Sequence, residues 1–135
     1  MTPKDKELLL KDLCARLPYR VKALYYGAEE ECETWDEIES VTIDGYVDIG
    51  QYSLSIEHIK PYLFPMSSMT EEQKREYNNL QCYVPIYYYE YRELVEEIEL
   101  HPTLESFEYL IKNHFDFRGL IKKGLAIDAT KLNIY

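Results

Sequence analysis

The sequence has few of the residues from which disulfide frameworks, zinc sites and phosphate-binding loops are built. Its three cysteines, Cys14, Cys32 and Cys82, are far apart and form no C-x-x-C pair, so neither a disulfide framework nor a zinc knuckle is predicted. The five glycines are scattered and match no phosphate-binding fingerprint. No two histidines stand at metal-ligand spacing, so we expect neither a metal site nor a cofactor.

Long apolar runs are also missing. No stretch is long enough to span a bilayer, and the N-terminus, MTPKDKELLLKDL, alternates charge with leucine. A signal peptide would have a continuous apolar core at this position. We therefore expect a cytoplasmic protein that does not bind a membrane.

Positive charge is absent from one segment. Residues 29–57 contain ten acidic residues and no Lys or Arg, a balance equal to the net charge of −10 of the whole chain. Nucleic-acid backbones are bound through Lys and Arg, so direct binding of DNA or RNA is not expected.

The acidic run AEEECETWDEIE, residues 28–39, has two interpretations. One is a solvated loop in which the acids are exposed and Trp35 folds back on the core. The other is an acidic contact surface for a basic partner protein. The residues of that surface are Glu29, Glu30, Glu31, Glu33 and Trp35.

Three helices are predicted from capping residues and apolar spacing. The first lies between Thr2 and Pro18, and the third runs from Leu104 to about His114. The second begins at Thr70, where the T-x-x-Q spacing is that of a capping box. On the first helix, Glu7–Lys11 and Asp12–Arg16 are i,i+4 pairs in the favourable acid-first order.

Residues 19–56 contain the runs that favour strands. A hairpin is expected around Asp44-Gly45. We expect a three-residue connection that places Ile43 opposite Val47, because this register puts the apolar residues on one buried face. The 135 residues are 46% hydrophobic and 30% charged, which is typical of a globular chain. Together these elements predict a single α+β domain over residues 1–135, with a small antiparallel sheet packed against three or more helices.

Tyrosine is dense in CYVPIYYYEYRELVEEIELHP, residues 82–102. Tyrosine side chains form half-buried walls or contact surfaces. Packing inside the domain is one interpretation, and a partner-binding patch of Tyr87, Tyr88, Tyr89 and Tyr91 is the other. Pro85 should break any helix here, and ELVEEIEL fits either a strand or a helix.

His114 and Asp116, with Arg118 nearby, are the best polar cluster in the sequence. A His-x-Asp pair can orient an imidazole as a general base. No activated nucleophile accompanies it, and a helix-end histidine with a capping aspartate is the simpler interpretation. These two residues are the catalytic or ligand-binding candidates if the protein is a small enzyme or a ligand binder.

Three blocks carry a resemblance to known sequences: KDKELLLKDLCARLPYRVK (4–22), IKPYLFPMSSMTEEQKREY (59–77) and NHFDFRGLIKKGLAIDATKLNIY (113–135). They resemble a family of small uncharacterised proteins of Bacteroidales, often encoded in prophages or other mobile elements. The family has no assigned activity, so the resemblance implies a bacterial or phage setting and no site residue. We expect a non-enzymatic accessory protein that binds another protein, as a phage or mobile-element modulator of a host system.

Overall fold

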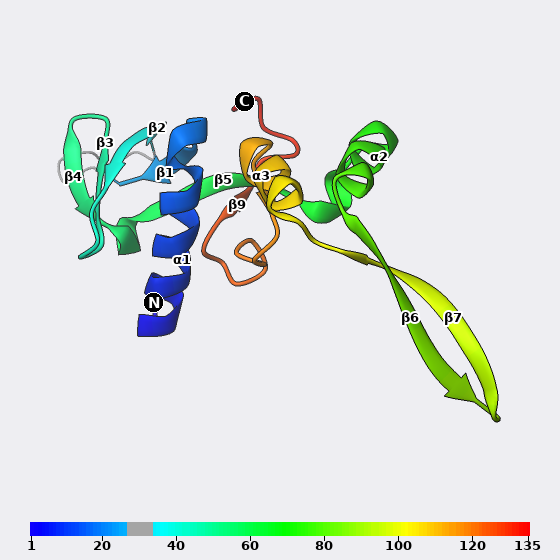
Figure 1. Ribbon diagram of the computed structural model, residues 1–135. Helices are drawn as coiled ribbons and strands as arrows, with labels where there is room; N and C mark the ends of the chain where they lie inside the picture. The colour runs from blue at the N-terminus through cyan, green and yellow to red at the C-terminus, as the bar shows by residue number, and fades with distance from the viewer. Residues whose placement is uncertain (27–33) are drawn as a thin grey trace. The chain divides into compact units, whose positions relative to one another are not determined.

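The computed structural model describes residues 1–26 and 34–135, which form two compact units (Figure 1). The first unit consists of Met1–Ser68 and Ile111–Tyr135, and the second of Met69–Leu110. The single domain expected from the length stays a prediction. In the described residues, three α-helices accompany a seven-stranded mixed sheet and a two-stranded antiparallel sheet, which confirms the α+β class.

The sheet of the first unit is larger than the small antiparallel sheet that was expected. Its strand order is β4-β3-β2-β1-β5-β8, and β9 also pairs with β5. The pairs of β5 with β8 and with β9 are parallel, and the others are antiparallel. The strands are β1 (Lys22–Tyr25), β2 (Thr34–Val41), β3 (Tyr46–Ile49), β4 (Tyr52–Ser55), β5 (Ile59–Pro65), β8 (Phe115–Asp116) and β9 (Ile127–Asp128).

Helix α1 (Pro3–Arg16) supplies the helical side of the core of the first unit. Thr2 and Asp5 form a reciprocal capping box at its start, and a 3-10 turn, Leu17–Tyr19, follows it. Leu9 and Leu13 are fully buried against the sheet. Their cluster includes Val21, Ala23, Val47, Ile49, Ile59, Leu63, Leu120 and Leu125. In the part of the chain that the structure describes, no helix is long and apolar enough to cross a membrane.

The predicted register of the β2–β3 hairpin is wrong by two residues, since Val47 was expected opposite Ile43. The loop consists of three residues, but it spans 43–45, because Thr42 and Tyr46 are joined by the Thr42 N–H to Tyr46 O hydrogen bond of 2.9 Å. Gly45 has a φ of 88°, which the last position of such a loop requires and which glycine adopts without strain. Val47 therefore pairs with Val41, and Ile43 is 93% exposed instead of buried.

The loop interpretation of the acidic run is wrong for its second half. Residues 34–39 belong to β2, which pairs with both β1 and β3. Trp35 lies on this strand and is 46% exposed, so it is not folded back on the core. The first half, with Glu29, Glu30, Glu31 and Glu33, lies outside the described residues.

The second unit contains α2 (Glu71–Asn79), β6 (Cys82–Glu90), β7 (Glu93–His101) and most of α3 (Leu104–Lys112). The predicted capping box at the start of α2 is confirmed, with Thr70 and Gln73 bonded to each other's backbone. Tyr109 connects α3 to α2, because its hydroxyl donates to Glu76 Oε2 at 2.8 Å. Phe107, an aromatic residue of α3, is 39% exposed.

Strands β6 and β7 form one long hairpin, drawn in Figure 1 as a twisted ribbon. They pair without a register shift from Cys82↔His101 to Glu90↔Glu93. ELVEEIEL is thus a strand, and Pro85 lies within β6. The turn consists of Tyr91 and Arg92, whose φ values of 49° and 68° are both positive.

Replacing Tyr91-Arg92 with Asn-Gly should stabilise the hairpin by about 1–2 kcal/mol, because a side chain at positive φ is strained and Asn-Gly suits this turn. Amide exchange in β6 and β7 should then slow by about tenfold. The control is Ala-Ala, which removes the same side chains and keeps the strain, and it should give no slowing. Equal exchange rates in the Asn-Gly and Ala-Ala variants would contradict this account.

Candidate functional site

The β6–β7 hairpin sorts its side chains onto two faces of different chemistry. Successive side chains of a strand point to opposite sides, so residues that pair across the hairpin share a face. We call one side the tyrosine face. It consists of Tyr83, Pro85, Tyr87 and Tyr89 from β6 and Leu94, Glu96, Ile98 and Leu100 from β7.

The tyrosine face is unusually exposed for its composition. Seven of its eight residues are apolar or aromatic, and the six large ones are between 41% and 76% exposed. Single exposed apolar residues are ordinary, but a contiguous set on one face is typical of an interaction site. The tyrosine face is therefore the candidate contact surface of the hairpin.

The opposite face of the hairpin is more polar and better covered. Its apolar residues Val84, Ile86 and Val95 are half-buried. The Tyr88 hydroxyl donates to Glu97 Oε1 at 2.7 Å, and this hydrogen bond raises the pKa of Tyr88. His101 Nε2 lies 3.2 Å from Glu99 Oε2. Four polar side chains of this face therefore have a partner within the hairpin.

The structure divides the four tyrosines of the predicted patch. Tyr87 and Tyr89 lie on the tyrosine face, Tyr88 lies on the opposite face, and Tyr91 lies in the turn, where it is 93% exposed. The prediction omitted Tyr83, Leu94, Ile98 and Leu100. For Leu94, Ile98 and Leu100 the signal was their even spacing along 94–100, which becomes clear once 93–100 is assigned to a strand. Residues 83–89 are all apolar or aromatic, so no alternation marked Tyr83.

Of the predicted acidic surface, only Trp35 is described. The Nζ atom of Lys22 lies 5.3 Å from the centroid of its ring, a cation–π contact within the first unit. Trp35 and the tyrosine face therefore belong to different units.

His114 lies in a hollow of about 320 Å³ lined also by Tyr19, Arg20, Lys22 and Tyr135. Its ring stacks on the ring of Tyr135 with a centroid separation of 3.8 Å. Burial, together with the nearby charges of Arg16 and Lys22, lowers the pKa of His114 to about 4. The imidazole is neutral at pH 7, and its low pKa makes it a poor general base.

Asp116 does not orient the imidazole of His114. Its two carboxylate oxygens accept the backbone N–H groups of Leu120 and Ile121, both at 2.9 Å. His114 Nδ1 is buried and has no hydrogen-bond partner among the described residues. The simpler interpretation, a helix-end histidine and a capping aspartate, fits this geometry, since the His114 N–H donates to Ile111 O just after α3.

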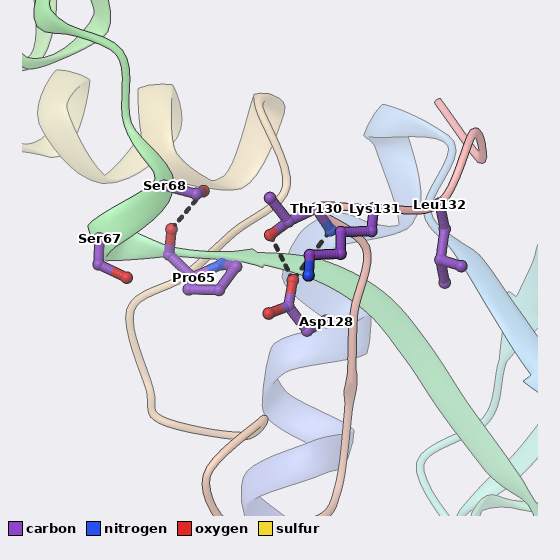
Figure 2. A pocket seen from close by; sticks show the side chains of 7 residues that line it. All are labelled: Pro65, Ser67, Ser68, Asp128, Thr130, Lys131 and Leu132. Carbon is purple, nitrogen blue, oxygen red and sulfur yellow. Dashed lines mark hydrogen bonds between the residues drawn. The ribbon is translucent and has the colours of Figure 1, made fainter.

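A second hollow, of about 590 Å³, lies where the end of β5 meets the chain after β9 (Figure 2). Its polar groups stabilise local turns. Ser68 Oγ donates to Pro65 O at 2.6 Å, and Asp128 Oδ1 accepts hydrogen bonds from the backbone N–H and the hydroxyl of Thr130. These bonds lower the pKa of Asp128. A hydroxyl nucleophile would need a hydrogen bond to a base such as Asp128. No hydrogen bond in Figure 2 joins the serines of residues 65–68 to Asp128.

In residues 1–26 and 34–135, no group of three or more His, Cys, Asp or Glu side chains could hold a metal ion. No protein-family model, no curated protein and no solved structure matches this chain.

Proposed function

We propose that the protein acts by binding another protein through the tyrosine face of the β6–β7 hairpin, as a non-enzymatic accessory protein. The observation that carries the proposal is the continuous exposure of Tyr83, Tyr87, Tyr89, Leu94, Ile98 and Leu100 on one face. Tyrosine is enriched in the cores of protein interfaces and among the few residues that dominate binding energy.

The energetics of a hairpin support the same conclusion. A two-stranded hairpin alone is only marginally stable in water, and this one exposes its apolar face along four of its nine paired positions. Burying one large apolar side chain contributes about 1.5–3 kcal/mol. A partner that covers the tyrosine face would therefore stabilise the hairpin and the complex together.

The alternative is a small enzyme or ligand binder that uses the hollow at His114. One observation favours it, the buried Nδ1 atom without a partner in the described chain. The position of Asp116 and the low pKa of His114 favour it less, because they remove the orienting carboxylate and the basicity that a general base needs.

The proposal includes that the protein is encoded by a phage or mobile element and modulates a system of the host. This part of the proposal rests on the resemblance of residues 4–22, 59–77 and 113–135 to the Bacteroidales family.

The test is affinity capture of the tagged full chain from a Bacteroidales lysate, followed by mass spectrometry. A specific partner should bind wild type and should lose at least about tenfold in affinity for the Tyr87→Ser/Tyr89→Ser variant, because truncating central aromatic anchors costs more than 1 kcal/mol each. Tyr88→Ser is the matched control, since Tyr88 is adjacent in sequence and lies on the opposite face. Its partner binding should remain within about twofold of wild type.

The result that would overturn the proposal is equal capture of the same partners by the double variant and the Tyr88→Ser control. Loss of binding in a His114→Asn variant with the hairpin variants unaffected would support the alternative instead.

A further inference from the structure

We infer that the outer edge of β7 binds an extended, basic segment of the partner protein as an added β-strand. This inference rests on the proposed function and specifies the chemistry of the partner. Among the described residues, β6 and β7 pair only with each other, so each strand has one outer edge without a neighbouring strand. Such an edge presents a row of backbone N–H and C=O groups that can pair with another chain.

The register decides which residues present these groups. The two-residue turn makes Glu90 and Glu93 the first hydrogen-bonded pair, and bonded and non-bonded pairs alternate from there along an antiparallel hairpin. The residues of the non-bonded pairs direct their backbone groups outward. On β7 these residues are Leu94, Glu96, Ile98 and Leu100.

The two edges differ in their capacity to accept a strand. On β6, the same alternation assigns Pro85 to an outward position, where it lacks the N–H that an added strand would need. Along β7, the run from Leu94 to Leu100 contains no proline, glycine or lysine, and the register has no bulge. Charged side chains, lysine above all, proline and bulges are the usual protections of an edge strand, and among these the β7 edge has only the charges of its glutamates. The β7 edge is therefore the one open to pairing.

Charge identifies the occupant of this edge. Residues 82–101 contain five glutamates and one arginine, and four of the glutamates, Glu93, Glu96, Glu97 and Glu99, belong to β7. A second copy of β7 would bring these carboxylates opposite like charges, which is destabilising across strands. A strand with Lys or Arg beside Glu97 and Glu99, and with apolar residues beside Leu94 and Ile98, would pair favourably on both faces. The edge thus suits a basic, alternating segment and not self-association.

The probe is a capped peptide, KTKVKVKT, titrated into the full chain and followed by amide chemical shifts. We expect shifts at Leu94, Glu96, Ile98 and Leu100, and weaker ones at Tyr87 and Tyr89. The acidic peptide ETEVEVET should bind at least about tenfold more weakly, because like charges then face Glu97 and Glu99. Glu97→Gln/Glu99→Gln should weaken binding of KTKVKVKT about threefold or more and reduce its dependence on salt.

The decisive pair of variants is Ile98→Pro and Ile98→Ala. Both remove the isoleucine side chain, but only proline removes the outward N–H, and the inner hydrogen bonds of the hairpin do not use that group. We expect Ile98→Pro to bind KTKVKVKT at least about tenfold more weakly than Ile98→Ala. Protected amides at Tyr88 and Val95 in both variants check that the hairpin remains folded.

Equal binding by Ile98→Pro and Ile98→Ala would overturn the edge inference. Concentration-dependent dimers of the wild-type chain that Ile98→Pro abolishes would also overturn it, in favour of a second copy as occupant. Neither result bears on the tyrosine face, whose own test is the Tyr87→Ser/Tyr89→Ser variant. A partner that is lost with that variant and that binds Ile98→Pro and Ile98→Ala equally well binds face-on, so the proposed function would stand without the added strand.

Discussion

Replacing Asp12 with alanine is expected to lower the free energy of unfolding by about 3–5 kcal/mol. Asp12 and Arg16 are both fully buried, and Arg16 Nε donates to Asp12 Oδ2 at 2.7 Å. Arg16 Nη2 also donates to Phe115 O at 2.6 Å, and Arg118 Nε lies 3.2 Å from Asp12 Oδ1. Asp12 is the one acidic side chain among the described residues that forms an ion pair with Arg16, so without it the buried guanidinium carries an uncompensated charge, which causes the loss.

Two further variants distinguish the cost of an unpaired buried charge from the stability that an ion pair itself contributes. Asp12→Leu/Arg16→Met removes both charges and should recover most of the stability, because well-packed apolar residues often replace a buried pair at little cost. Glu7→Ala breaks the Glu7–Lys11 pair, which has the same i,i+4 spacing on the same helix but is largely exposed. It should cost less than about 0.5 kcal/mol. Urea unfolding measures the free energy of unfolding of all three variants. A loss under about 1 kcal/mol in Asp12→Ala would contradict an unpaired buried charge at Arg16.

Acidification from pH 6.5 to pH 4 should remove up to about 3 kcal/mol of stability through His114 alone. Its pKa is about 4 in the folded protein and 6.5 when unperturbed, because the folded site buries the ring near Arg16 and Lys22. Between these values the unfolded chain binds more protons than the folded one, so stability falls as the pH falls. The contribution is complete above pH 6.5 and is lost as the pH passes through 4.

The measurement is the free energy of unfolding against pH for wild type and His114→Asn. Asparagine tolerates the positive φ of 61° at this position and does not titrate. Carboxyls with a lowered pKa, such as Glu37 beside Arg20 and Glu57 beside Lys6, also destabilise the protein when acid protonates them. This loss is the same in wild type and in His114→Asn. The free energy of unfolding of wild type minus that of His114→Asn should therefore decrease from pH 6.5 to pH 4. Parallel curves would show that His114 is protonated as easily in the folded state as in the unfolded chain.

Local interactions were predictable from the order of residues. The capping box of Thr70 and Gln73 joins residues three apart, so its partners are set by the chain itself wherever the helix lies. Asp116 was predictable for the same reason, because it caps a turn by accepting backbone N–H groups four and five residues further along the chain. The β2–β3 connection was harder, because two registers put apolar residues on one face. Only the φ of Gly45 selects the register that exposes Ile43.

The hairpin shows why the candidate site was only partly predictable. The density of tyrosine around Tyr87 and Tyr89 was visible, but it is equally consistent with a strand that packs inside a domain. Tyr91-Arg92 gives no turn signal of the Asn-Gly kind, so neither the pairing of β6 with β7 nor their shared face followed from composition. The separation of Tyr88 from Tyr87 depends on that pairing.

The two ion pairs on α1 show most clearly which properties the sequence decides and which only the tertiary structure decides. Glu7–Lys11 and Asp12–Arg16 have the same spacing, order and charges, and the chain alone predicts the same weak helix-surface pair for both. Tertiary structure exposes the first and buries the second, where Phe115, which follows Arg16 by 99 residues, provides a carbonyl acceptor. Helix caps and strand alternation are decided by neighbours along the chain. Burial and its electrostatic consequences are decided by segments that only folding brings together.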